Sequence, residues 1–212
     1  MNRTTHVMRL HRREILASLG AAALALPGCA ALQRPEPPQL YVLRPELAPP
    51  MGEPVRWRLA VATPDAVASL DTPRIALTRS PTTMDYFANA AWTDRVPLLL
   101  QHMIVQAFDT SGRIVSVDKD TAGLESDFLL QTEIRDFQAR YVSATGAPEI
   151  DVGIQVKLVR MPQREIAGGV YASEQAMAAS NTLDEIVTAF NHASGAAISR
   201  IVGWTLAQPA PT

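Results

Sequence analysis

The clearest pattern in the chain is a strict alternation of apolar and polar side chains over residues 150–159. A period of two is typical of a strand with one buried face. Residues 127–141 alternate in the same way, but the phase slips near Arg135 and Asp136, which predicts a bulge. Because turn-forming residues 143–148 separate the two segments, we expect an antiparallel hairpin.

Weaker apolar patterns predict further strands on both sides of this hairpin. The segments concerned are residues 40–43, 55–62, 74–79, 113–117 and 165–176. Gly168 and Gly169 weaken the last of these predictions, since glycine in a strand has no side chain to pack. The pattern of residues 84–92 favours neither helix nor strand.

Two segments carry apolar residues at the three- and four-residue spacing of an amphipathic helix. The first runs from Val96 to Ala107, with Thr93 or Asp94 as the expected cap, Pro97 in the first turn and residues 109–112 as its end. The second runs from Leu183 to Ile201, with Asn181 or Thr182 as cap and two acids in its first turn.

The expected fold is therefore α/β or α+β, a mixed and largely antiparallel sheet packed with two long amphipathic helices. We expect one domain over residues 40–207 and a tail at 208–212. The pattern does not fix the order of the strands.

Residues 1–28 are typical of an export signal rather than of a fold. Four arginines stand before an unbroken run of apolar and small residues from Ile15 to Leu26. Crossing a bilayer takes about 20 apolar residues, so this run is short for a permanent anchor. The pair Arg12-Arg13 also fits a twin-arginine signal, and the general and twin-arginine export routes both stay open.

The run ends at Leu26-Pro27-Gly28-Cys29, which resembles the lipobox of bacterial lipoproteins. Gly28 and Cys29 fit that motif, whereas Pro27 departs from the usual small residue. Cys29 is the only cysteine of the chain, so we predict cleavage before it and a covalent lipid on its thiol. The proline-rich residues 29–39 would then form an extended tether.

Removal of residues 1–28 would take away four arginines and one glutamate, changing the formal net charge from −2 to −5. This acidic balance disfavours nucleic-acid binding. The membrane contact is therefore expected through the lipid anchor, on the periplasmic side of the envelope. In enteric-type sorting, Ala30 after the cysteine favours the outer membrane over the inner.

The mature sequence offers little catalytic chemistry. Its two histidines, His102 and His192, fall in different predicted helices, so no metal site is expected. No nucleophile elbow, phosphate-binding loop or dinucleotide motif is present. Carboxylates such as Asp118, Asp120 and Asp136 show no arrangement that indicates catalysis. We expect no enzyme and no cofactor beyond the lipid.

Tyr86, Phe87 and Trp92 place three aromatic side chains close together in the chain, just before the first helix. Aromatic residues contribute much of the binding energy of protein interfaces, so this segment is a candidate partner surface. The alternative, which we favour slightly, is that these rings close the core where sheet and helix meet.

These features in order resemble the ABC-type transport auxiliary lipoprotein family. The resemblance rests on the lipobox near Cys29, the segment Tyr41-Val42-Leu43, residues 84–92 with the following helix, residues 127–137 and the long C-terminal helix. It implies a non-enzymatic subunit that works with a mammalian-cell-entry (MCE) domain protein and an ABC permease and ATPase. The cargo would be lipid or another apolar molecule, and the resemblance allows a homo-oligomer.

Two other functions stay open at this point. One is a structural lipoprotein of a secretion or envelope-assembly machine, and the other is a lipoprotein that itself binds a small apolar ligand. An enclosed apolar pocket under the sheet would favour the second of these.

Overall fold

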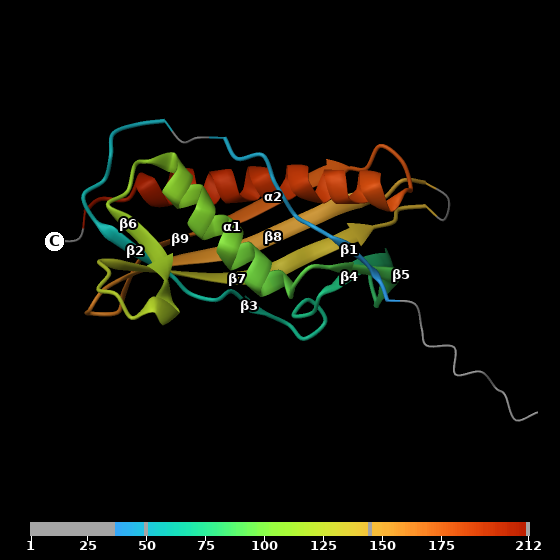
Figure 1. Cartoon of the computed structure of the whole chain (residues 1–212), viewed down its shortest axis with the longest axis horizontal. Coiled ribbons are helices and arrows are strands. Elements are labelled where there is room, and N and C mark those ends of the chain that lie inside the picture. Colours follow the sequence, from blue (N-terminus) through green and yellow to red (C-terminus); the bar gives the residue numbers. More distant parts are fainter. Residues whose placement is uncertain (1–36, 49–50, 144–145, 211–212) are drawn as a thin grey trace, which may run out of the picture. The chain divides into compact units, whose positions relative to one another are not determined.

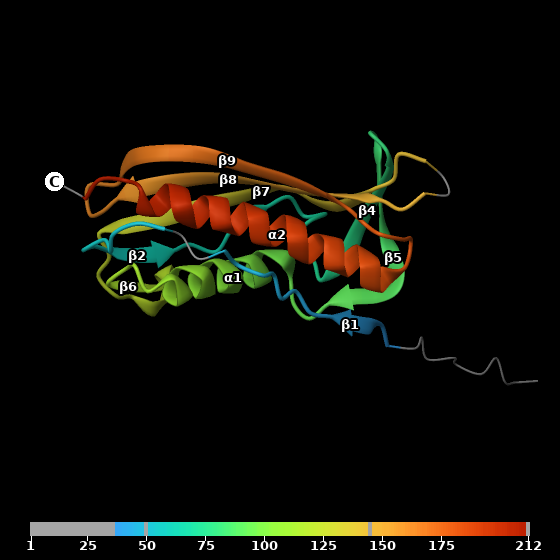
Figure 2. The same cartoon turned by 90° about the horizontal axis from the view of Figure 1, so that it is seen from above.

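The computed structural model describes residues 37–48, 51–143 and 146–210, in which nine strands form one mixed sheet with two α-helices on one of its faces (Figures 1 and 2). This confirms the expected fold class. The elements are β1 (Gln39–Tyr41), β2 (Arg58–Val61), β3 (Asp65–Ala66), β4 (Arg74–Ser80), β5 (Thr83–Trp92), α1 (Val96–Ser111), β6 (Ser116–Lys119), the 3₁₀ turn η1 (Asp120–Ala122), β7 (Phe128–Arg140), β8 (Glu149–Arg160), β9 (Glu165–Met177) and α2 (Leu183–Leu206).

The sheet is built around the long strand β7. One edge of β7 pairs with β8 from Phe128 to Arg140, and β8 pairs with β9 in turn, both antiparallel. The other edge of β7 is shared by β2, β3 and β4, which pair with it in parallel at successive positions. Three further strands extend these short neighbours: β6 pairs with β2, β5 pairs with β4, and β1 pairs with β5.

The predicted hairpin and its bulge are both confirmed. The register between β7 and β8 shifts between Ile134 and Asp136, which leaves Arg135 as the extra residue. On either side of this bulge, the residues facing the helices are buried without interruption, including Ile134, Phe137 and Ile154. A single inserted residue therefore reconciles two phases of alternation with one buried face.

Several predicted boundaries were wrong. Residues 84–92 belong to a ten-residue strand, β5, which the alternation did not indicate. Its last three residues, Ala90 to Trp92, are all buried, so polar and apolar positions do not alternate there. The strand expected at 113–117 lies at 116–119, and the one expected at 55–62 is confined to 58–61.

Both helices lie where the apolar spacing predicted, but their caps differ. Arg95 precedes α1 and supplies no side-chain cap, so neither Thr93 nor Asp94 caps this helix. Pro97 does occupy the first turn, and Gly112 ends the helix in a left-handed conformation, with φ of 61°. Thr182, one of the two expected cap residues, does occupy the N-cap position of α2, although its side chain makes no cap hydrogen bond, and Asp184 and Glu185 stand in the first turn as expected.

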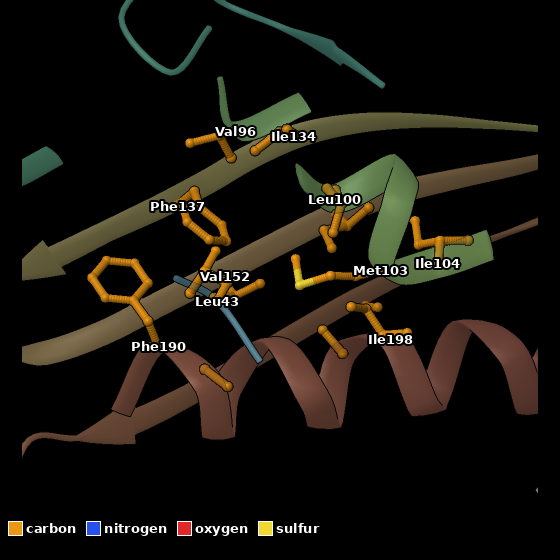
Figure 3. Close-up of a cluster of buried hydrophobic side chains, with 14 of the residues drawn as sticks. Leu43, Val96, Leu100, Met103, Ile104, Ile134, Phe137, Val152, Phe190 and Ile198 are labelled. Atoms are coloured by element: carbon orange, nitrogen blue, oxygen red, sulfur yellow. The ribbon is translucent and has the colours of Figure 1, made fainter. Parts of the chain in front are cut away.

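The core fills the space between the sheet and the two helices. Figure 3 shows its centre, where side chains of α1 and α2 meet those of β7 and β8. Phe137, Phe190, Leu100, Ile104 and Ile198 are each at most 1% exposed. Leu43, which follows β1, also belongs to this cluster and is 6% exposed, so the N-terminal segment contributes to the core.

The opposite face of the β7–β9 sheet carries no helix and is polar (Figure 2). Arg140 on β7 forms ion pairs with Asp151 and Glu149 on β8, with 2.7 Å between Arg140 Nε and Asp151 Oδ2. Gln175 on β9 donates to the same Asp151. These cross-strand contacts link three strands on the side away from the core.

Candidate functional site

The aromatic segment does not form one surface. Trp92 is 1% exposed and packs edge-on against Phe190 and Phe137, with ring centroids 5.1 and 6.1 Å apart. Trp92 is therefore a core residue, as the favoured alternative predicted, and it is not part of a partner surface. Tyr86 and Phe87 are adjacent on β5, so their side chains leave opposite faces of the strand.

Tyr86 is half-buried beneath an arginine. The Arg74 guanidinium lies 3.7 Å from the centre of the Tyr86 ring, a cation–π contact. The Tyr86 hydroxyl donates to the backbone carbonyl of Ser69 at 3.1 Å. Arg74 has no carboxylate partner among the described residues.

Phe87 belongs to a second aromatic pair. Its ring lies 6.5 Å from that of Tyr141, which stands just after β7, and the Arg79 guanidinium lies 5.0 Å from the Tyr141 ring. Burial raises the pKa of the Tyr141 hydroxyl, and the positive charge of Arg79 opposes this shift. The protonated hydroxyl donates to Asn181 Oδ1 at 2.5 Å, which joins the end of β7 to the segment before α2.

Residues 42–48 cross the outer side of the helix pair as an extended segment, here called the strap. Its backbone N–H groups donate to side chains of α2, from Arg44 to Asn191 Oδ1 at 2.7 Å and from Ala48 to Ser199 Oγ at 3.2 Å. Leu43 lies between β1 and the first of these attachments in the chain, and its side chain is buried in the core. The strap is thus held by backbone and side chain together.

Gly195 allows the strap to approach α2 closely. It lies between Asn191 and Ser199 on the same side of the helix, and a Cβ atom here would stand 2.5 Å from the Glu46 carbonyl oxygen. Any larger side chain at this position would displace the strap. The sequence analysis missed this contact because Asn191, Gly195 and Ser199 carry no apolar signal.

Open grooves flank the strap on both sides. One, of about 490 Å³, lies between the strap and α1, and the other, of about 450 Å³, lies between the strap and α2. The first is lined by Val42, Leu43, Arg44, Pro45, Leu47, Thr93, Leu99, His102, Met103 and Gln106. These are surface grooves, whereas the space under the sheet is filled by the aromatic and aliphatic core.

The two histidines lie on opposite sides of the strap, His102 in the groove beside α1 and His192 in the groove beside α2. Within the described part of the chain, no three His, Cys, Asp or Glu side chains converge as a metal ion would require. Asp136, which the sequence singled out, accepts a hydrogen bond from the Tyr171 hydroxyl at 3.2 Å. Asp118 lies in the edge strand β6, and Asp120 begins the 3₁₀ turn after it.

The lipobox residues Leu26, Pro27, Gly28 and Cys29 lie outside the described residues, as do the export signal and residues 29–36 of the tether. Between residues 37 and 210, leaving aside the two short gaps, neither helix is both long and apolar enough to cross a bilayer.

Comparison with protein families decides the identity of the chain. Residues 40–202 match the model of the ABC-type transport auxiliary lipoprotein component. The chain belongs to this family. The match begins at β1 and extends through most of α2, so it covers the strap, the sheet and both helices. The description of the family is that of an auxiliary lipoprotein component of ABC-type transport.

Individual proteins are similar to the chain in sequence or in fold. A crystal structure of a Xanthomonas campestris protein of family DUF330 is 25% identical, with a TM-score of 0.74, and covers 79% of this chain and 94% of its own. A second solved structure, of an uncharacterised protein, is 17% identical with a TM-score of 0.62 and shares the fold. An uncharacterised Bradyrhizobium diazoefficiens protein is 27% identical over 173 residues, covering 78% of this chain but only 44% of the relative, which is much longer.

Proposed function

We propose that this auxiliary lipoprotein is a non-enzymatic, lipid-anchored subunit of an ABC transport system that contains an MCE-domain protein. It would stand on the periplasmic side of the envelope and help the system move lipid or another apolar cargo between membranes. The observation that carries the proposal is the family match over residues 40–202, which begins shortly after the lipobox cysteine, Cys29. The domain is thus joined to the anchor by a short tether.

Charged groups with a shifted pKa have partners within the fold, which is consistent with the proposed non-enzymatic role. The pKa of the Asp127 carboxyl is lowered first by the side-chain hydrogen bond from Arg58. The backbone N–H of Arg58 also donates to this carboxyl and lowers its pKa further. Arg95 and Arg140 are likewise held by neighbouring carboxylates. These are contacts between elements of the fold, and they explain the shifted groups without a substrate.

The proposal is tested by affinity purification of the lipidated chain from membranes, with the partners identified by mass spectrometry. The expected partners are an MCE-domain protein with its permease or ATPase. A Cys29→Ser variant is the control, because it removes the thiol and should lose both lipid labelling and membrane association. Recovery of secretion-machine components, or of bound lipid without a protein partner, would contradict the proposal and favour one of the two alternatives.

The outer membrane is the proposed site of the anchor, on the basis of Ala30. In a host with enteric-type sorting, Ala30→Asp is expected to move the protein to the inner membrane, since an acidic residue after the lipidated cysteine favours retention there. Separation of the two membranes by density, with detection of the protein in each, measures this. An unchanged distribution would show that residue 30 does not direct sorting.

A further inference from the structure

One end of the domain, here called the tether end, gathers the elements nearest to Pro37. The register places the end of β7, the start of β8 and the end of β9 together, and β4, β5 and β1 extend the sheet from there. Both views show β1, β5 and the start of α2 at this end (Figures 1 and 2). Burial and the negative charge of Asp184, in the first turn of α2, both raise the pKa of Tyr41 on β1.

Exposed apolar side chains occur on three of the segments at this end. Leu40 and Val42 are 59% and 45% exposed, and Val142, just after β7, is 77% exposed. Met177, the last residue of β9, is 64% exposed. Single exposed apolar residues are ordinary, so these acquire meaning only from their position beside the tether.

The same end carries the two arginine–aromatic pairs described above. Arg74 lies over Tyr86, and Arg79 lies over Tyr141 beside Phe87. Neither arginine has a carboxylate partner among the described residues. Tyr86 is half-buried and Tyr141 is only 8% exposed, whereas Arg74 and Arg79 are both exposed. An arginine with an apolar stem suits the boundary between water and lipid, because the stem can contact apolar groups while the charged end stays wet.

The length of the tether limits which surface can meet the membrane. Eight residue steps separate Cys29 from Pro37, and a fully extended chain spans at most about 29 Å over that number. The 24 residues of α2 extend about 36 Å from the tether end to the far end. With Cys29 at the bilayer, the tether is too short for the domain to stand upright on its far end, and it keeps the tether end within about 29 Å of the membrane.

We propose that the tether end rests on the bilayer as a second membrane contact beside the lipid anchor. Leu40, Val42 and Val142 would enter the headgroup region, and Arg74 and Arg79 would contact the phosphates of anionic lipids. This inference rests on the proposed lipid on Cys29. It orients the domain, because the two helices then point away from the membrane and the far end, with β2, β6 and the start of β9, faces the partner.

The test uses the full lipidated chain. The lipid blocks the thiol of Cys29, so that a single cysteine added by substitution is the only free thiol. Leu40→Cys, Val142→Cys and Met177→Cys place a bimane fluorophore at the tether end. Leu124→Cys and Ile166→Cys place it at the far end, and they are matched controls because these side chains are 63% and 66% exposed. Each labelled protein is reconstituted in phosphatidylcholine–phosphatidylglycerol vesicles with and without nitroxide-bearing phosphatidylcholine.

The expected result is severalfold stronger quenching by the lipid nitroxide at the tether-end positions than at the far-end positions. Vesicle-bound protein whose tether-end probes are not quenched would overturn the inference and leave the proposed function intact. The same conclusion would follow if these probes were shielded from aqueous iodide but not quenched by lipid, since a second copy would then cover them. Protein that does not float with vesicles and whose Cys29 takes up bimane would overturn both proposals.

The arginines are tested separately with Arg74→Gln and Arg79→Gln in the Val142→Cys background. Quenching in the parent should be stronger when phosphatidylglycerol is present, and the two substitutions together should abolish that difference. Lys119→Gln, on the edge strand β6 at the far end, is the control and should leave the difference unchanged. Persistence of the phosphatidylglycerol effect without both arginines would overturn their assignment to the headgroups.

Discussion

Phe190 lies where three buried rings meet, with its centroid 5.1 Å from those of both Trp92 and Phe137. Through these two contacts, Phe190 packs α2 against both β5 and β7. All three rings are at most 1% exposed, and no apolar neighbour can expand to fill a vacated site of this size.

We therefore expect Phe190→Ala to lower the free energy of unfolding by about 3–5 kcal/mol, the usual cost of removing a buried aromatic ring. Urea unfolding followed by tryptophan fluorescence measures the change. Val142→Ala, at an exposed position, is the control and should change the stability by less than about 0.5 kcal/mol. A small loss for Phe190→Ala would mean that the ring cluster is not packed as described.

Substitution of Gly195 by alanine should have the opposite effect on stability from the same substitution at an ordinary helix glycine. Alanine in place of glycine inside a helix ordinarily stabilises by about 0.5–1 kcal/mol, and Gly203→Ala should do so because nothing lies within 4 Å of its added Cβ. Gly195→Ala should instead loosen the strap, since its Cβ would meet the Glu46 carbonyl. Cleavage after Glu46 by a glutamate-specific protease should become faster only in Gly195→Ala, and equal behaviour of the two variants would contradict the strap contact.

At this scale the sequence was informative where side chains alternate and uninformative where they do not. Ile134, Val152 and Ile154 could be assigned to the core because their neighbours are polar or small. For Trp92 the alternation gave no assignment, because it follows two buried alanines at the end of β5, where the strand has no exposed position to set the phase. Its core position was predicted only as the favoured of two alternatives. The pairing of Tyr86 with Arg74 on the neighbouring strand depends on a strand register that no local pattern contains.

Among the elements, β2 is fastened to the start of β7 by charge as well as by the strand ladder. Asp127 Oδ2 accepts hydrogen bonds from the backbone N–H of Arg58 at 2.7 Å and from its Nε at 3.2 Å. The side-chain hydrogen bond from Arg58 lowers the pKa of the Asp127 carboxyl against the opposing effect of burial. A folded pKa below the unfolded value means that the contact stabilises the fold when the carboxyl is ionised.

This contribution is present above the unfolded pKa of about 3.9 and is lost as the pH falls through the lower folded value. Asp127→Asn should cost about 0.5–1 kcal/mol at neutral pH, since both groups are partly exposed and screened by solvent. The difference between the variant and the parent should shrink below about pH 4. Urea unfolding at several pH values measures it, with Glu125→Gln, at a 90% exposed side chain, as the control. A difference independent of pH would exclude the ion pair as its cause.

Strand pairing could be predicted only where the two strands are close together in the sequence. The β7–β8 hairpin closes over a short turn, so two adjacent patterns sufficed. The parallel pairing of β7 with β2, β3 and β4 joins segments that are far apart in the sequence, as in Leu59 beside Phe128. At α2 the cap position was predicted correctly as Thr182, whereas Asn181, the other candidate, accepts a hydrogen bond from the distant Tyr141.

In the whole molecule, stability should fall from the centre of the sheet towards the N-terminal segment. β8 pairs along its length with β7 and β9 and is packed under α2. β1 has three residues and a single described partner strand, β5. Hydrogen exchange read by mass spectrometry should show β8 amides exchanging only on global unfolding and the β1 and strap amides much earlier. Equal protection of the two regions would mean that the strap opens only with the whole fold.

The path of residues 37–48 also decides where mechanical load would be carried if a partner pulled the domain away from its anchor. Tension on the tether would act along the axis of β1, so its hydrogen bonds to β5 would be strained together in shear rather than opened one at a time. Behind β1, the insertion of Leu43 and the Arg44–Asn191 bond would resist next. The hairpins formed by β7, β8 and β9 do not lie between the tether and these contacts. They would therefore stay folded even if β1 and the strap detached.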